Sequence, residues 1–149
     1  MTDRNSSDQP DVIPMLDYED GPTAMDWLKN AFGFVEVTRM IGDDGLLAHG
    51  ELQTGNGCIM LGTASPAYES PKHHREHCPQ AKAWSEVPYI IDGVLVYVED
   101  VTQHFAHAKQ AGAVILSPLE TGFPGLRYRA EDLEGHRWMF IQKTPAESI

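Results

Sequence analysis

The second half of the chain repeats the pattern of its first half 78 to 80 residues further on. Tyr18-Glu19-Asp20 opens a helical stretch that ends at Phe32-Gly33, and Val98-Glu99-Asp100 opens another that ends at Ala111-Gly112. A repeat of this length indicates two copies of one supersecondary unit. The chain can therefore be read by comparing each residue with its counterpart in the other half.

Each copy has the order of one strand, one helix and three strands. Apolar runs predict the strands, Asp20 and Asp100 are suited to cap the helices, and Asn56-Gly57 marks a hairpin turn. Two helices are too few to cover both faces of a doubly wound sheet. We therefore predict an α+β fold in which two βαβββ modules form curved mixed sheets around a cavity, with the helices outside.

The predicted divisions are a disordered tail (1–10), a first module (11–62), a connecting loop or lid (63–88), a second module (89–142) and a second tail (143–149). The connection shows no clear periodicity, and structureless loops longer than about 15 residues are usually functional or mobile. It carries the cluster His73, His74, His77 and Cys78, which could hold a metal. We interpret it as an exposed loop, because its spacing matches no common zinc motif.

Composition limits the partners of this chain. A net charge of −11 argues against nucleic acid, because phosphate binding needs clustered Lys and Arg. We expect no membrane partner, since no apolar run approaches the roughly 20 residues that span a bilayer. The first residues lack the pattern of a signal peptide, and two cysteines make no disulfide framework. We therefore expect a cytoplasmic protein whose charge serves solubility, or attracts a cationic ligand.

The hairpin segment Asp132-Leu133-Glu134-Gly135-His136, together with the paired helix starts and ends, resembles the vicinal oxygen chelate superfamily. That superfamily includes glyoxalase I, extradiol dioxygenases, and the bleomycin and fosfomycin resistance proteins. The match extends from about Val12 to Gln142, with Leu133 where the family has proline. The resemblance implies a small-molecule ligand and a homodimer whose grooves combine both chains.

The resemblance also implies four metal-ligand positions, two lying seven residues before the helix-capping Asp and two lying four residues after the hairpin Gly. Here these positions hold Ile13, Gly93, Leu61 and Met139. None suits Zn, Fe, Mn or Ni, which bind imidazole, carboxylate or thiolate. We therefore expect no metal and no other cofactor. Whether the chain is an enzyme stays open at this point, and these four positions favour a protein that is not one.

Strand alternation predicts which side chains share the inner face. It places Arg137 with Met139, and Ile59 with Leu61, and it puts Met60, Trp138 and Phe140 on the opposite face. Family geometry turns Arg127 and Arg129 inward, and the repeat makes His49 and Glu51 their counterparts. The predicted ligand-binding residues are His49, Glu51, Leu61, Tyr97, Arg127, Arg129, Arg137 and Met139. In the alternative interpretation, Glu51 pairs with an arginine and closes the cavity.

Three arginines favour a ligand with an anionic or carbonyl oxygen, to which guanidinium makes bidentate hydrogen bonds. We predict a glyoxalase/bleomycin-resistance-like protein that binds a small organic ligand without a metal and sequesters a drug or toxin. One alternative is a metal-dependent lyase or isomerase of the glyoxalase I type, with His49 and Glu51 as a metal pair or as a base and its orienting carboxylate. A regulatory module without turnover is the third hypothesis.

Overall fold

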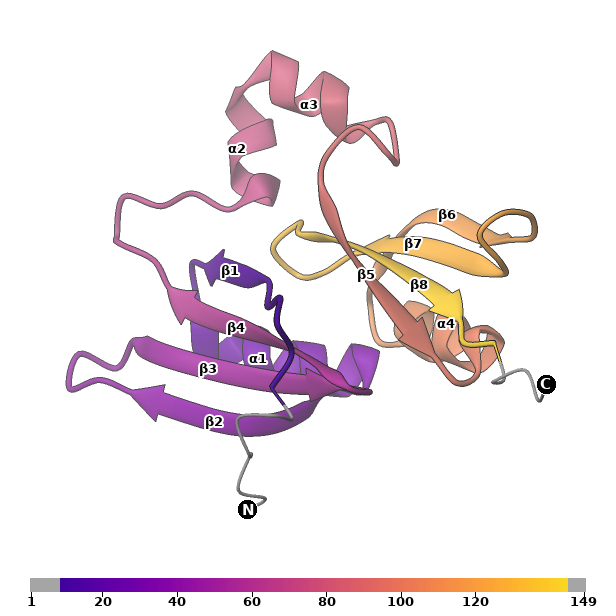
Figure 1. Cartoon of the computed structure of the whole chain (residues 1–149). Helices are drawn as coiled ribbons and strands as arrows, with labels where there is room; N and C mark the ends of the chain where they lie inside the picture. The colour runs from indigo at the N-terminus through magenta and orange to yellow at the C-terminus, as the bar shows by residue number, and fades with distance from the viewer. Residues whose placement is uncertain (1–8, 145–149) are drawn as a thin grey trace.

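The computed structural model describes residues 9–144, and it confirms an α+β fold of two βαβββ modules (Figure 1). The predicted tails lie partly outside this range, over residues 1–8 and 145–149. The first module consists of β1 (Met15–Tyr18), α1 (Gly21–Phe32), β2 (Val35–Ile41), β3 (Leu47–Thr54) and β4 (Gly57–Thr63). The second consists of β5 (Gly93–Val98), α4 (Val101–Gln110), β6 (Val114–Glu120), β7 (Arg127–Glu131) and β8 (Arg137–Gln142).

The two sheets have the same topology. Their strand orders are β1-β4-β3-β2 and β5-β8-β7-β6, with the first pair of each sheet parallel and the others antiparallel. One helix packs on one face of each sheet, α1 on the first and α4 on the second (Figure 1). We call the face without the helix the open face. Each module therefore presents one sheet face that its own helix does not cover.

Local sequence signals set the helix ends as predicted. The Asp20 carboxylate accepts a hydrogen bond from the Thr23 N–H at 3.1 Å, and Gly33 ends α1 with φ of 76°. The Asp100 carboxylate accepts from the Gln103 N–H at 3.1 Å. These caps satisfy N–H groups that the first helical turn leaves without partners.

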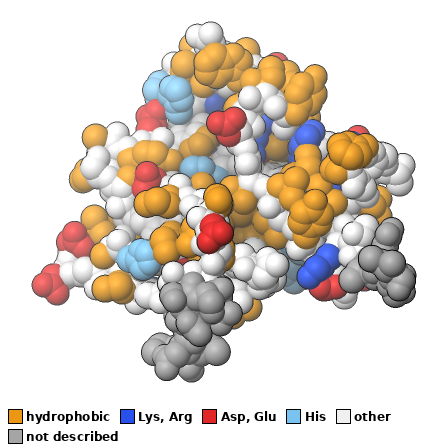
Figure 2. All heavy atoms as spheres, in the orientation of Figure 1, with side chains coloured by type: hydrophobic (Ala, Val, Ile, Leu, Met, Phe, Trp, Pro, Cys, Tyr) orange, Lys and Arg blue, Asp and Glu red, His pale blue; other side chains and the backbone are white. Residues whose placement is uncertain are grey.

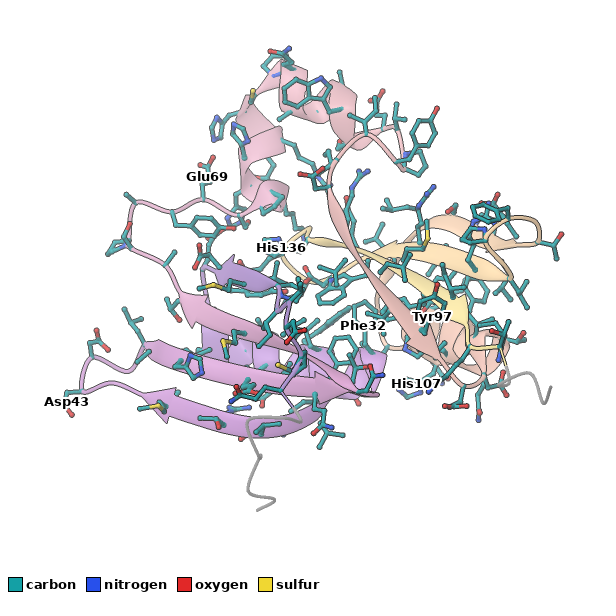
Figure 3. All side chains as sticks on the ribbon, viewed as in Figure 1. Phe32, Asp43, Glu69, Tyr97, His107 and His136 are labelled. Carbon is teal, nitrogen blue, oxygen red and sulfur yellow. The ribbon has the colours of Figure 1, made fainter. Side chains whose placement is uncertain are left out.

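The core joins the two modules through aromatic side chains. Phe32, at the end of α1, packs against Trp138 and Phe140 of β8 with ring centroids 5.7 and 4.7 Å apart (Figure 3). Phe34 adds a contact to Trp138 at 5.4 Å. Trp138 and Phe140 are 1% and 0% exposed, so their predicted place under the helices is confirmed. The helix-side faces of both sheets thus share one core.

The segment between the modules is not a structureless loop, which corrects the sequence-based expectation. It contains α2 (Pro71–His77) and α3 (Pro79–Ser85), and each helix has proline in its first turn. The Ser70 hydroxyl caps α2 by accepting from the His73 N–H at 3.3 Å. Helices of seven residues make about two turns, which is too short for a periodic apolar pattern to stand out.

A hairpin of the second module holds the start of α1. The Glu134 carboxylate accepts backbone N–H bonds from Glu19 at 2.7 Å and from Asp20 at 3.0 Å. The neighbouring Asp132 carboxylate accepts from the Tyr18 hydroxyl at 2.6 Å and from the Trp138 indole at 3.1 Å. Burial raises the pKa of Asp132, while these hydrogen bonds oppose that shift. Two nearly buried carboxylates therefore connect the modules.

We expect Glu134→Gln to lower the free energy of unfolding by about 1–3 kcal/mol, because an amide offers one acceptor oxygen where two N–H groups need one each. Urea denaturation measures the change. Glu120→Gln, on an exposed residue, is the matched control and should stay within about 0.5 kcal/mol of wild type. Equal effects of the two variants would contradict a connecting role for Glu134.

His104 of α4 forms a second connection between the modules. Its Nε2–H donates to the Phe32 carbonyl at 2.9 Å, and Nδ1 lies 2.5 Å from the Tyr128 hydroxyl. Burial lowers the pKa of His104, which favours the neutral ring, and in that form Nδ1 accepts from the Tyr128 hydroxyl.

Because the folded pKa of His104 is lowered, its neutral form stabilises the fold above the unfolded pKa of about 6.5, and this contribution is lost as pH falls below that value. We expect the stability difference between wild type and His104→Gln to be larger at pH 7.5 than at pH 5.5. Urea midpoints at the two pH values measure it. A difference that does not change with pH would contradict this assignment.

Candidate functional site

The register of β4 turns Met60, and not Leu61, toward the open face. Gly50 pairs with Leu61, and Glu51 pairs with Met60. A Cβ atom on Gly50 would lie 2.6 Å from the Met25 sulfur of α1, so Gly50 and Leu61 face the helix. Leu61 is 3% exposed and belongs to the core. The prediction of Leu61 as a cavity residue, and of Met60 as core, is therefore wrong.

The error comes from one residue in a hairpin. In the first module, the paired residues Thr54 and Gly57 enclose Gly55 and Asn56, so the turn lies one residue earlier than predicted. In the second module, Asp132 and His136 are joined by a backbone hydrogen bond of 2.9 Å and enclose three residues. The offset between the repeats is therefore 79 along β4 and β8, and Met60 corresponds to Met139.

The other three family metal positions also hold residues that are not strong metal ligands. Ile13 precedes β1, Gly93 pairs with Arg137 in the second sheet, and Met139 lies on the open face beside Arg129. Replacing Leu61 by Met60 adds only a second thioether, which is a soft ligand. Within residues 9–144, no group of three or more His, Cys, Asp or Glu side chains is placed to hold a metal ion.

A pocket of about 280 Å³ opens on the open face of the second sheet. Leu95, Leu116 and Met139 form apolar walls, and Arg129 contributes a charged group. The other lining residues are Pro88, Tyr89, Ile91, Asp92, Gly93, Val94, Arg137 and Trp138. Figure 2 shows apolar side chains over this module with Lys and Arg side chains among them. The structure thus brings together Arg129, Arg137 and Met139 of the predicted set.

The guanidinium of Arg129 is available to a ligand. It forms no hydrogen bond or ion pair with any other residue in the range 9–144. Arg127, two residues earlier on the same face, differs because its Nη1 donates to the Gly125 carbonyl at 3.1 Å. Arg127 therefore holds the loop before β7, while Arg129 faces the pocket with its donors unused.

Arg137 shapes the pocket wall. Its Nη1 and Nη2 donate to the carbonyls of Val87 and Ser85 at 2.7 and 2.5 Å, and its Nε donates to Glu131 at 3.3 Å. Its side chain is 3% exposed. The guanidinium thereby fixes the segment that leads from α3 into the wall residues 88–92. The sequence did not indicate Glu131, because a buried carboxylate on a strand has no local signal.

The other predicted site residues lie elsewhere. His49 and Glu51 are opposite Met40 and Thr38 on the open face of the first sheet. Tyr97, which is 55% exposed, lines a cleft of about 410 Å³ between β5 and the β3–β4 hairpin (Figure 3). His49, Glu51 and Tyr97 do not line the pocket that contains Arg129.

The His-rich segment is explained by contacts of α2. His73 Nδ1 lies 2.7 Å from a Glu19 carboxylate oxygen, and His77 Nε2 lies 2.5 Å from Glu69. His136, predicted to be structural, has Nε2 at 2.7 Å from the Asp17 carbonyl and packs edge-on against the Tyr18 ring. His73 and His136 thus attach the connecting segment and the hairpin to the first module, while the His77 contact lies within the connecting segment.

The profile of the Glyoxalase/Bleomycin resistance protein/Dioxygenase superfamily matches residues 15–140. An uncharacterised protein of Mycobacterium bovis is 30% identical over 139 residues, which are 90% of this chain and 84% of that protein. The crystal structure of TioX from Micromonospora sp. ML1 has a TM-score of 0.65 and 31% identity over 93% of this chain and 100% of that one. TnmS3, an antibiotic binding protein from Streptomyces sp. CB03234, has a TM-score of 0.59 over 91% of this chain and 98% of that one. Its 14% identity shows a shared fold alone.

The register of β4 predicts different costs for two neighbouring truncations. Leu61→Ala should lower the free energy of unfolding by about 2–5 kcal/mol because it opens a cavity in the core. Met60→Ala, on the open face, should cost about 1 kcal/mol or less. Urea denaturation of the two variants measures the contrast, and the reverse order would show that the strand has the opposite phase.

Proposed function

The chain belongs to the Glyoxalase/Bleomycin resistance protein/Dioxygenase superfamily, and we propose that it binds a small organic molecule, without a metal, in the pocket beside Arg129. The biological role in this proposal is sequestration of a drug or toxin. Its location is the cytoplasm, which rests on sequence composition alone. Separately, none of the helices in the described range 9–144 could span a bilayer.

The single observation that carries the proposal is the unengaged guanidinium of Arg129 among apolar walls. A charged group in a concave site is costly unless it finds a partner. Guanidinium makes paired hydrogen bonds to carboxylate or carbonyl oxygens, while Leu95, Leu116 and Met139 suit an apolar body. The ligand of this proposal therefore has an apolar body and an anionic or carbonyl oxygen at one end.

The proposed role in resistance is taken from the descriptions of two proteins that share the fold. TnmS3 is described as an antibiotic binding protein, and a FosX from Listeria monocytogenes, with a TM-score of 0.60 and 12% identity, is described as a fosfomycin resistance protein. Sequestration needs affinity and no reacting group. This agrees with the residues at the family metal positions, which offer a metal ion at most a thioether sulfur.

A homodimer is part of the proposal. The open faces expose large apolar side chains, including Met15 at 81%, Met40 at 56% and Leu95 at 47%. Exposed apolar groups gathered on one face are typical of interaction surfaces. Light scattering coupled to size exclusion measures the mass, and a monomer at micromolar concentration would contradict this part.

Native mass spectrometry of protein purified without chelator or added metal tests the binding proposal. We expect a dimer that carries an organic adduct and no metal. Arg129→Gln should lose the adduct, because one charge-assisted hydrogen bond contributes about 1.5–3 kcal/mol, or roughly 10- to 150-fold in affinity. Arg127→Gln, the matched control on the same strand, should retain most of it.

Two outcomes would contradict the proposal. Retention of the adduct by Arg129→Gln would remove the ligand from this pocket. One transition metal per chain would instead support the metal-dependent lyase or isomerase of the glyoxalase I type, with His49 and Glu51 as candidate ligands.

A further inference from the structure

A second cavity, of about 320 Å³, lies between the short helices α2 and α3 and the β7–β8 hairpin. It is lined by Tyr68, His74, Arg75, Trp84, Ile91 and Glu131, among others. Ile91 is the one residue that also lines the pocket beside Arg129. The two cavities are therefore separate sites that meet at Ile91, and their size suits small molecules.

At the base of this cavity, two arginines share one glutamate. Glu131 is 2% exposed and accepts hydrogen bonds from Arg75 Nη1 at 2.7 Å and from Arg137 Nε at 3.3 Å. Two guanidinium groups thus share one buried carboxylate, and Arg75, whose side chain is 26% exposed, forms no ion pair with a second carboxylate within residues 9–144. An anion bound beside Arg75 would supply that partner.

Arg75 has the donors for such an anion. Its Nε and Nη2 find no partner among residues 9–144, whereas the other donors of Arg137 reach backbone carbonyls. Glu69, labelled in Figure 3, also lines the cavity. One of its carboxylate oxygens lies 2.5 Å from His77 Nε2.

Arg75 forms an ion pair with Glu131 alone within the described part of the chain. It also lines a separate hollow together with Glu76, Lys82 and Glu86, but neither of these two glutamates lies within ion-pair distance of it.

The walls of the cavity suit an aromatic ring. Trp84 lies on α3 and is 46% exposed. The residue of α3 that is buried is Ala81, so Trp84 is not part of the core. A large aromatic side chain that does not serve the core is characteristic of a binding surface. Tyr68 lines the same cavity, and burial raises its pKa to about 12, so its hydroxyl stays neutral and adds no negative charge.

We propose that this cavity is a second ligand site, selective for a small planar aromatic anion. The carboxylate or sulfonate of the ligand accepts hydrogen bonds from the free donors of Arg75, and its ring packs on the indole of Trp84. The proposal goes beyond binding at Arg129 and is independent of it, since the two sites have different arginines.

The probe is 2-naphthoate, compared with the neutral 2-naphthamide. The indole N–H signal of Trp84 in a nitrogen-15 NMR spectrum reports binding, and Trp84→Phe assigns it. We expect a saturable shift with 2-naphthoate, in wild type and equally in Arg129→Gln, and at least about tenfold weaker binding of 2-naphthamide. Arg75→Gln should weaken 2-naphthoate binding about tenfold or more. Lys82→Gln removes a positive charge from α3 at a residue that does not line the cavity, and it should stay within about twofold of wild type.

Three results would overturn the site. They are an unshifted Trp84 signal, a shift that persists in Arg75→Gln but is lost in Arg129→Gln, and equal binding of acid and amide. Because Arg75→Gln removes one partner of the buried Glu131, Trp84→Ala provides a second test that leaves these charges untouched. By calorimetry, Trp84→Ala should lose about tenfold or more in affinity for 2-naphthoate, since stacking on an aromatic ring contributes about 1–3 kcal/mol. Wild-type affinity in a folded Trp84→Ala variant would overturn the site as well.

Discussion

The fold depends on carboxylates of the second module that accept hydrogen bonds from the first. Glu134 binds the N–H groups of Glu19 and Asp20, where the chain turns from β1 into α1. Asp132 binds Tyr18 from one module and Trp138 from the other, so the same hairpin also places the central aromatic of the core. Near-complete burial makes these bonds hard to replace, because water cannot reach the groups they satisfy.

The same hairpin anchors the connecting segment. The Glu134 carbonyl accepts from the Lys72 N–H of α2 at 3.0 Å, and Gly135, with φ of 91°, leaves no room for a side chain there. A Cβ atom at Gly135 would lie 2.8 Å from the Lys72 nitrogen. The hairpin thus positions α2, α2 positions Arg75 over Glu131, and Arg137 ties the chain after α3 to the pocket wall. Both proposed sites are arranged by this chain of contacts.

The repeat gives both modules the same topology but not the same chemistry. The second sheet has arginines on its open face, while the first has methionines with His49 and Glu51. The chain as a whole is acidic, with a net charge of −11, but its cavities contain guanidinium groups. Salt screens charges beyond about 8 Å at physiological ionic strength, so a bound ligand experiences mainly the groups that line its cavity. This is why anionic ligands are compatible with an acidic protein.

The sequence by itself determined the two-module fold, the helix caps and the aromatic core, because each depends on signals a few residues apart or on the internal repeat. The site was only partly predictable. Arg129, Arg137 and Met139 do share a pocket, but Leu61 faces the core because a turn one residue shorter shifts the register, and a shift of one residue turns a strand over. Contacts between residues about 50 positions apart decided two further features. They determine which arginine keeps free donors, and they let α2 and α3 enclose a cavity beside the buried Glu131. Such contacts leave no periodic pattern in a single sequence, so only the tertiary structure could determine them.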